Sequence, residues 1–114
     1  MTITLMESSL IYAASDSLKY KVNWVNVSDE TEWVYFGADA EVNKPLVVKN
    51  ITDFFPDSSL FIAINRKESI MINRNDLAKS LDNILGLKDF FIWDSQFKKA
   101  IEFSHIGVMR LGYI

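Results

Sequence analysis

The sequence predicts a single α+β domain over residues 1–114: a mainly antiparallel sheet with a C-terminal β-meander, packed against one or two helices. Three observations support this prediction. The chain has 114 residues, which is the size of one ordinary domain. Hydrophobic residues make up 49% of it, enough to build a core without cross-links. In its last quarter three apolar or alternating runs, Phe90–Asp94, Phe97–Phe103 and Ser104–Arg110, are separated by short polar turns, which is typical of consecutive antiparallel strands.

Two periodicities overlap in the N-terminal third. A helical spacing relates Leu10, Ala14, Leu18, Val22 and Val25. Every second position from Tyr20 to Trp24 is apolar or aromatic, which is typical of a strand. The interpretation that fits both is a short helix over Glu7–Leu18 followed by a strand over Lys19–Val27.

Shorter signals follow in the middle of the chain. Glu32–Phe36 is predicted to be a strand that ends at the next residue, a glycine. Asn43–Pro45 interrupts the chain, and Leu46–Val48 is interpreted as a strand or an extended lead-in. Ile51–Phe55 is predicted to be one helical turn or a loop, because a proline follows it.

The second half begins with two strands and the best helix. Leu60–Ile64 is a continuous apolar run, which predicts a central strand covered on both faces, and Ile70–Ile72 is expected to return beside it. A helix is predicted from Arg74 to Leu85, with Asn73 as its N-cap and Gly86 just past its end. Its apolar stripe is Leu77, Leu81, Ile84 and Leu85, expected to be buried with Phe61, Phe91 and Ile101.

Composition and charge restrict the function classes. The net charge is −3 and there is no cysteine, which excludes disulfides and thiolate metal sites. The most strongly charged segment, between Asp29 and Asp53, is acidic, so we expect no nucleic-acid partner and a preference for a basic one. The start of the chain lacks the basic and long apolar regions of a secretory signal, and no apolar run reaches about 18 residues, so we expect a cytoplasmic protein without membrane contact.

Residues with catalytic chemistry are few. His105 is the only histidine, and its neighbour Ser104 points to the other face of any shared strand, so a Ser/His/Asp triad with Asp94 is not expected. Asp89, Asp94 and Glu102 lie in an aromatic-rich region, where burial would raise a carboxyl pKa. A structural explanation is stronger: Asp94 stands at a turn, and Glu102 is expected to be solvated or paired across the sheet. We therefore predict no enzymatic activity, no metal and no cofactor.

A partner-binding segment is the remaining candidate. Trp33 and Tyr35 share one face of their predicted strand and lie within the acidic segment. Aromatic residues beside charged ones are typical anchors of protein interfaces. The predicted partner-binding residues are Asp29, Glu30, Glu32, Trp33, Tyr35, Asp39 and Glu41.

The C-terminal third, from about Asn73, resembles the closing meander of small bacterial immunity proteins of polymorphic toxin and contact-dependent growth-inhibition systems. The similarity lies in the aromatic strand that ends at Asp94, in Phe97 at the start of the next run, and in the turn from His105 to Gly107. It implies a cytoplasmic protein without catalysis that binds and neutralises a cognate toxin domain, often a basic nuclease. No binding residue can be transferred by this resemblance, because its motifs are turn and core positions.

A second hypothesis remains open from the sequence. A small regulatory or adaptor module of phage or plasmid origin, binding another protein, would show the same composition. The two hypotheses differ only in the partner, and the sequence leaves the oligomeric state open as well.

Overall fold

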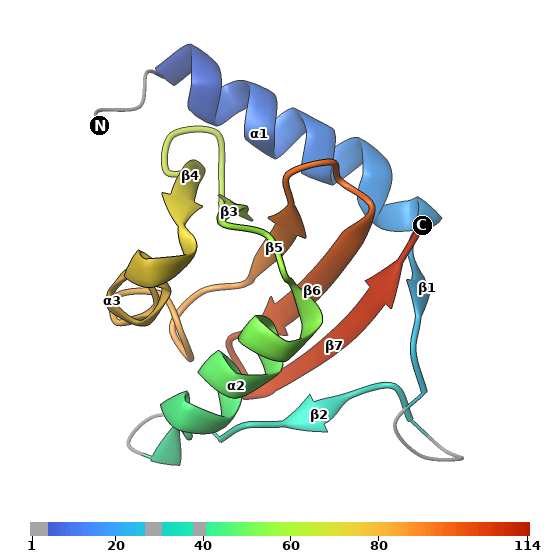
Figure 1. The fold of residues 1–114 in the computed structure, drawn as a ribbon, viewed down its shortest axis with the longest axis vertical. Coiled ribbons are helices and arrows are strands. Elements are labelled where there is room, and N and C mark those ends of the chain that lie inside the picture. Colours follow the sequence, from blue (N-terminus) through green and yellow to red (C-terminus); the bar gives the residue numbers. More distant parts are fainter. Residues whose placement is uncertain (1–4, 27–30, 38–40) are drawn as a thin grey trace.

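A seven-stranded antiparallel sheet lies at the centre of the part of the chain that the computed structural model describes, residues 5–26, 31–37 and 41–114 (Figure 1). Helices lie on both of its faces, which confirms the predicted α+β class. In chain order the elements are α1 (Leu5–Leu18), the 3₁₀ helix η1 (Lys19–Lys21), β1 (Asn23–Trp24), β2 (Val34–Tyr35), α2 (Lys44–Phe54), β3 (Ser59–Ala63), β4 (Ile70–Asn73), the 3₁₀ helix η3 (Arg74–Asp76), α3 (Leu77–Leu81), β5 (Phe90–Asp94), β6 (Lys99–Ser104) and β7 (Val108–Tyr113).

The strand order is β1-β7-β6-β5-β3-β4, and β2 also pairs with β7. The predicted C-terminal meander is therefore confirmed as β5-β6-β7. Two short strands share the outer edge of β7: β1 pairs Asn23 with Tyr113, and β2 pairs Val34 with Met109. The central position predicted for Leu60–Ile64 is also confirmed, because β3 lies between β4 and β5.

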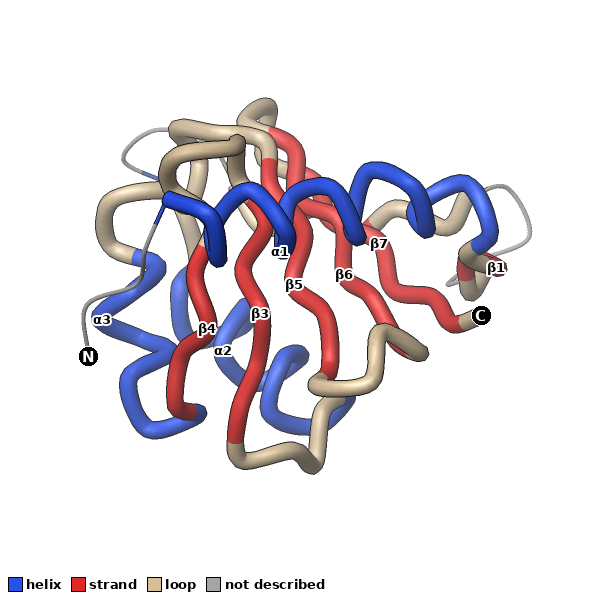
Figure 2. Tube along the Cα trace, turned by 90° about the horizontal axis from the view of Figure 1, so that it is seen from above, coloured by secondary structure: helices blue, strands red, loops and turns tan. Residues whose placement is uncertain are grey.

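Alternate residues of the central strands enter two separate cores. On the side of α2 and α3, Leu60 and Ile92 are buried in the larger core. On the side of α1, Phe61, Phe91 and Trp93 belong to the smaller one, and Figure 2 shows α1 on the opposite side of the strands from α2 and α3. The prediction that Phe61 and Phe91 pack with the α3 stripe is therefore wrong, because successive strand residues point to opposite faces.

Small side chains let α1 lie close to the sheet. Its buried positions are Ser8, Ile11 and Ser15, whereas Leu10 is 64% exposed. The helix predicted over Glu7–Leu18 is confirmed, but Leu10, one of the apolar residues at helical spacing, faces solvent. The hydroxyl of Ser8 accepts a hydrogen bond from the backbone N–H of Ser69 in the β3–β4 turn, and the hydroxyl of Ser15 accepts one from the indole N–H of Trp93 in β5, so both serines are buried with a partner.

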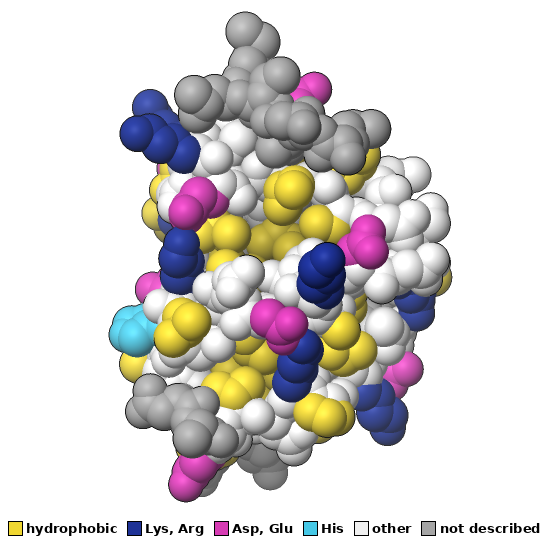
Figure 3. All heavy atoms as spheres, turned by 90° about the vertical axis from the view of Figure 1, so that its left-hand side faces the viewer, with side chains coloured by type: hydrophobic (Ala, Val, Ile, Leu, Met, Phe, Trp, Pro, Cys, Tyr) yellow, Lys and Arg dark blue, Asp and Glu magenta, His cyan; other side chains and the backbone are white. Residues whose placement is uncertain are grey.

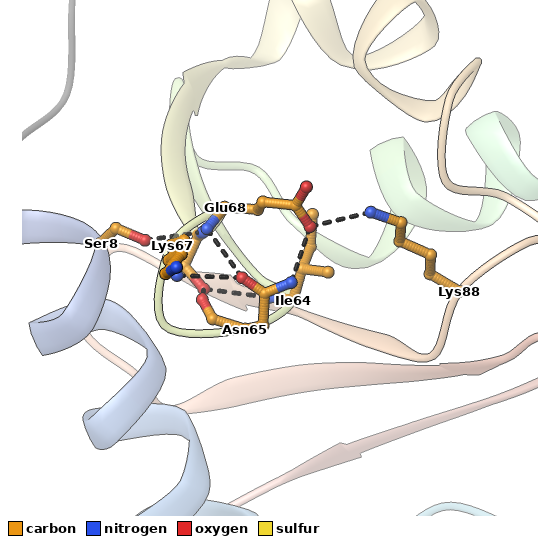
Figure 4. A network of polar contacts seen from close by, with 7 residues as sticks. Ser8, Ile64, Asn65, Lys67, Glu68 and Lys88 are labelled. Carbon is orange, nitrogen blue, oxygen red and sulfur yellow. Dashed lines mark hydrogen bonds and ion pairs between the residues drawn. The ribbon is translucent and has the colours of Figure 1, made fainter. Parts of the chain in front are cut away.

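The turn between β3 and β4 is held from two sides (Figure 4). The Asn65 side chain accepts hydrogen bonds from the backbone of Lys67 and Glu68, as Asx turns do. Glu68 receives the Lys88 ammonium group at 2.8 Å. Ser8 of α1 accepts from the backbone N–H of Ser69 at 2.9 Å, which fixes the helix to this turn.

The segment expected to contain a break and a strand forms α2 instead. Asn43 caps the helix by accepting from the Leu46 N–H, and Pro45 stands in the first turn, where its missing N–H costs nothing. Val47 and Ile51, one turn apart, are fully buried. Their burial outweighs the low helix propensity of β-branched residues.

The strand predicted over Lys19–Val27 is also shorter than expected. Residues 19–21 continue α1 as a 3₁₀ helix, and only Asn23–Trp24 pairs with β7. Gly112 of β7 permits this pairing, because a Cβ atom there would lie 2.6 Å from the Asn23 carbonyl oxygen.

The helix predicted over Arg74–Leu85 is divided. A 3₁₀ turn capped by Asn73 leads into α3, and turns follow up to Gly86, which has the left-handed φ of +77° expected at its position. The whole predicted stripe is nevertheless buried, so the amphipathic pattern located the core correctly.

Candidate protein-binding surface

The α1 face of the sheet is only partly covered at the middle of β6 and β7, whereas Ala100, near the start of β6, is fully buried in the core beneath α1. Helix α1 packs against β3 and β4, while Glu102 of β6 and Arg110 of β7 remain partly exposed on the same face. Aromatic side chains from β1, β2, β5 and η1 surround them. We call this surface the aromatic patch; it consists of Tyr20, Trp24, Trp33, Tyr35, Phe91, Glu32, Glu102 and Arg110.

Arg110 is the centre of the aromatic patch. Its guanidinium carbon lies 4.2 Å from the ring centroid of Trp24 and 4.5 Å from that of Trp33, so both indoles make cation–π contacts with it. Each such contact contributes about 0.5–2 kcal/mol, depending on how dry the pair is.

Two carboxylates also bind this guanidinium group through hydrogen bonds and ion pairs. Arg110 donates to Oε1 of Glu102 at 2.7 Å and, through Nη1, to Oε1 of Glu32 at 2.5 Å. Glu102 and Arg110 are direct cross-strand partners in the β6–β7 register, so the strand pairing itself brings them together. Glu32 comes from the segment before β2, so the ion pair also ties that segment to β7.

The aromatic patch contains a shallow recess of about 200 Å³. Its lining residues are Lys19, Tyr20, Trp24, Phe91, Glu102 and Arg110. Pockets for small ligands usually measure about 300–1,000 Å³, so this recess has the size for one side chain of a partner. Lys19 is held at its rim by Asp16 at 2.9 Å, and that hydrogen bond raises the pKa of the Lys19 ammonium group.

Some of the predicted partner-binding residues lie in the aromatic patch. Trp33 and Tyr35 lie on one face, as predicted. Trp33 makes a cation–π contact with Arg110, and Tyr35 pairs with Val108, which precedes Arg110 by two residues on β7. Tyr35 is 63% exposed. Glu32 is bound to Arg110 rather than free, and Glu41 is exposed after β2. Three further predicted residues, Asp29, Glu30 and Asp39, lie outside the described residues.

Sequence reasoning left Arg110, Glu102 and Phe91 out of the predicted site. One signal was present: residues 102 and 110 carry opposite charges on adjacent strands of the meander, at matching distances from the His105–Gly107 turn. The two indoles gave no comparable signal, because only the pairing of β1 and β2 with β7 brings them to Arg110.

His105 lies outside the aromatic patch, exposed in the β6–β7 turn as expected. Its backbone N–H and its Nδ1 atom both lie 2.8 Å from Oδ1 of Asp89. These contacts, the backbone hydrogen bond first, lower the pKa of Asp89. Asp94, the third member of the triad considered above, accepts from the backbone of Lys98 and Lys99 at the other end of β6. The six residues of β6 separate it from His105 by about 20 Å.

The described residues contain no cluster of three or more His, Cys, Asp or Glu side chains that could hold a metal ion. None of their helices is both long and apolar enough to cross a membrane.

Comparison of the chain with protein-family models, with curated proteins and with solved structures finds no match.

Proposed function

We propose that this protein is a non-catalytic immunity protein that binds a cognate bacterial toxin domain through the aromatic patch and neutralises it. The aromatic patch supports protein binding as the class of function, and the resemblance of the C-terminal meander to immunity proteins supports a toxin as the partner. The cytoplasm, where such a toxin acts, is the proposed location.

The single observation that carries the proposal is the composition of the patch. Trp, Tyr and Arg are the residue types most enriched among interface residues whose truncation costs about 2 kcal/mol or more. Here two Trp, two Tyr and one Arg lie together on the open part of one sheet face. A single exposed ring is ordinary on a protein surface, but a contiguous cluster of exposed aromatic side chains marks an interaction site, and Tyr35, which is 63% exposed, belongs to such a cluster.

The geometry also favours binding over catalysis. His105, the only histidine of the chain, is engaged with a carboxylate, and the neighbouring Ser104 hydroxyl accepts from the Ile106 backbone at 3.4 Å. A nucleophile needs a base within hydrogen-bond reach, and these two side chains do not supply that pair. A binding protein instead needs a rigid surface, and the aromatic patch is built on paired strands.

A basic toxin domain fits the charge of the chain. The protein has a net charge of −3, which accelerates encounter with a positively charged partner. The buried aromatic anchors would then slow dissociation, because short-range contacts control that rate. Blocking the surface of the toxin around its active site is sufficient for neutralisation.

Growth rescue tests the proposal. Where a large secreted protein with a C-terminal toxin domain is encoded directly upstream, that domain is expressed in a bacterium with and without this chain. We expect the chain to restore growth and Tyr35→Ala to weaken the rescue. Tyr113→Ala is the matched control, because Tyr113 is also exposed but pairs with Lys99, whose side chain contacts Phe54 on the other face of the sheet.

Two outcomes would contradict the proposal. Growth arrest that persists with the wild-type chain would exclude an immunity function toward that toxin and favour the adaptor hypothesis. Full rescue by Tyr35→Ala together with failure of Tyr113→Ala would place the interface on the α2 side of the sheet.

A further inference from the structure

The charged groups in and around the recess carry one more negative than positive charge. Lys19, Glu102 and Arg110 line the recess, while Asp16 pairs with Lys19 and Glu32 pairs with Arg110 from outside its lining. Arg110 uses one oxygen, Oε1, of each of its glutamates. The second oxygen of each glutamate therefore has no hydrogen-bond donor among the described residues, while the side chains are only 26–30% exposed.

The walls of the recess suit a flat cation. Phe91 lies 6.5 Å from Trp24, tilted by 39°, and both rings line the recess. Within the described residues, cations already lie over Trp24 and over Tyr20, and Phe91 has none. A guanidinium group stacks on aromatic faces and binds carboxylates with paired donors, which a lysine ammonium group does less well. The Trp24–Arg110–Trp33 stack shows that this surface holds a guanidinium group in that way.

From these observations we propose that the recess beside Arg110 receives an arginine side chain of the toxin domain, which binds Glu102 and stacks on Phe91. The toxin as the source of the arginine rests on the proposed function. The recess of about 200 Å³ accommodates one long side chain, so the contact is an anchor within a larger interface.

The recess can be tested without any toxin. A ¹⁵N-labelled sample is titrated with acetyl-Gly-Arg-Gly-amide and, separately, with the same peptide carrying citrulline, which has nearly the same shape but no charge. The chain has three tryptophans, so three indole N–H signals report. Trp24 and Trp33 lie in the aromatic patch, while Trp93 is buried against Ser15 and serves as an internal reference.

We expect the arginine peptide to shift the Trp24 and Trp33 signals saturably, in the millimolar range, and to leave the Trp93 signal in place. The citrulline peptide should cause less than a third of that shift at equal concentration. The corresponding lysine peptide should bind at least about threefold more weakly, because an ammonium group does not stack.

Variants locate the binding site. Glu102→Gln keeps an oxygen acceptor for Arg110 but removes one negative charge, and we expect it to weaken binding of the arginine peptide at least threefold. Asp53→Asn is the control, since Asp53 is an exposed carboxylate of α2 beyond the recess. An unchanged Trp93 signal in Glu102→Gln confirms that the variant is folded; if it is not, Phe91→Leu provides a second test through the loss of the stacking ring.

Equal shifts by the arginine and citrulline peptides, tight binding of the lysine peptide, or unchanged affinity in folded Glu102→Gln would each overturn the arginine recess. None of these results depends on a toxin, so a failed titration would contradict the arginine recess but not the immunity function, which the growth-rescue assay tests. A failed rescue with a successful titration would contradict the immunity function, and the arginine would then come from another partner.

Discussion

The indole N–H of Trp93 donates a hydrogen bond of 2.8 Å to the hydroxyl of Ser15, which lies 78 residues earlier in the chain. Trp93 is fully buried in β5, and Ser15 is buried in α1. This single bond therefore joins the first helix to the middle of the sheet. A buried tryptophan needs such a partner, because a buried N–H without one loses its hydration uncompensated.

Ser15→Ala should lower the free energy of unfolding by about 1–3 kcal/mol, because it leaves the Trp93 N–H unpaired in the core. Urea denaturation measures the change. Ser17→Ala is the control: Ser17 is exposed on the same helix, and its replacement should alter the stability by no more than about 0.5 kcal/mol. Equal effects of the two variants would show that the bond to Trp93 contributes nothing specific.

The core on the other face depends on α3. Leu81 is fully buried there, so Leu81→Ala should cost about 2–5 kcal/mol through lost transfer energy and the cavity that remains. Leu87, only a few residues later, is 67% exposed, and Leu87→Ala should change the stability by less than about 0.5 kcal/mol. Thermal and urea unfolding of both variants check the pair. A loss below half a kcal/mol for Leu81→Ala would show that the α3 stripe is not core.

The meander and α3 were predictable because their signals are local. Alternation over β5 and the i, i+4 spacing of Leu77 and Leu81 both describe how one element meets its core. The failure at α2 has the opposite cause. Pro45 and the β-branched residues after it are poor helix formers, and only burial of Val47 and Ile51 against the sheet reverses that preference.

The candidate site was only half predictable. Trp33 and Tyr35 could be assigned to one face, because both belong to one strand. Their meeting with Arg110 could not, since the Glu32–Arg110 ion pair spans 78 residues and depends on β2 pairing with β7. The buried face of α1 was not predictable either. Hydrophobicity favours burial of Leu10, but the helix lies so close to the sheet that the small residue Ser15 is buried instead.

The Asp89–His105 contact predicts a pH effect of known sign. The folded pKa of Asp89 lies below its ordinary value of 3.8, so its contribution to stability is present above that value. The contribution is lost as the pH falls through the folded pKa. Asp89→Asn should therefore flatten the dependence of unfolding free energy on pH below about pH 4. The effect is small, because the Asp89 side chain is 70% exposed. If the unfolding free energy of the variant depends on pH below about pH 4 as in the wild type, the Asp89–His105 contact contributes nothing to stability.

His105→Gln separates the two hydrogen bonds that Asp89 accepts from residue 105. The backbone bond is the larger cause of the lowered pKa, and the variant retains it. We expect the pKa of Asp89, measured by carboxyl ¹³C NMR, to stay below 3.8 in the variant, with stability changed by less than about 1 kcal/mol. Biological activity should remain nearly intact. Its complete loss in a folded variant would point to catalysis by His105.

If the proposed toxin domain is the partner, the acidic segment of the sequence should govern the rate of association with it. Combined replacement of Glu30, Glu32 and Asp39 by their amides should slow association at low salt. The difference should shrink as salt is raised, because the screening length falls from about 10 Å at 0.1 M to about 3 Å at 1 M. Glu32→Gln alone is the necessary control, since Glu32 also binds Arg110 and its loss can loosen the aromatic patch.

Trp33→Ala should act mainly on the dissociation rate constant. Its ring covers one side of Arg110 and is partly exposed, so its removal should speed dissociation more than it slows association. Surface plasmon resonance at several salt concentrations separates the two rate constants, and a melting curve of each variant shows whether it is folded. A folded Trp33→Ala variant with unchanged dissociation would remove this ring from the interface.

An association rate of the triple amide variant equal to wild type at every salt concentration would show that the acidic segment is only a solvated face. The interface would then lie outside the acidic segment, along the exposed side of the meander that carries Glu102 and Arg110.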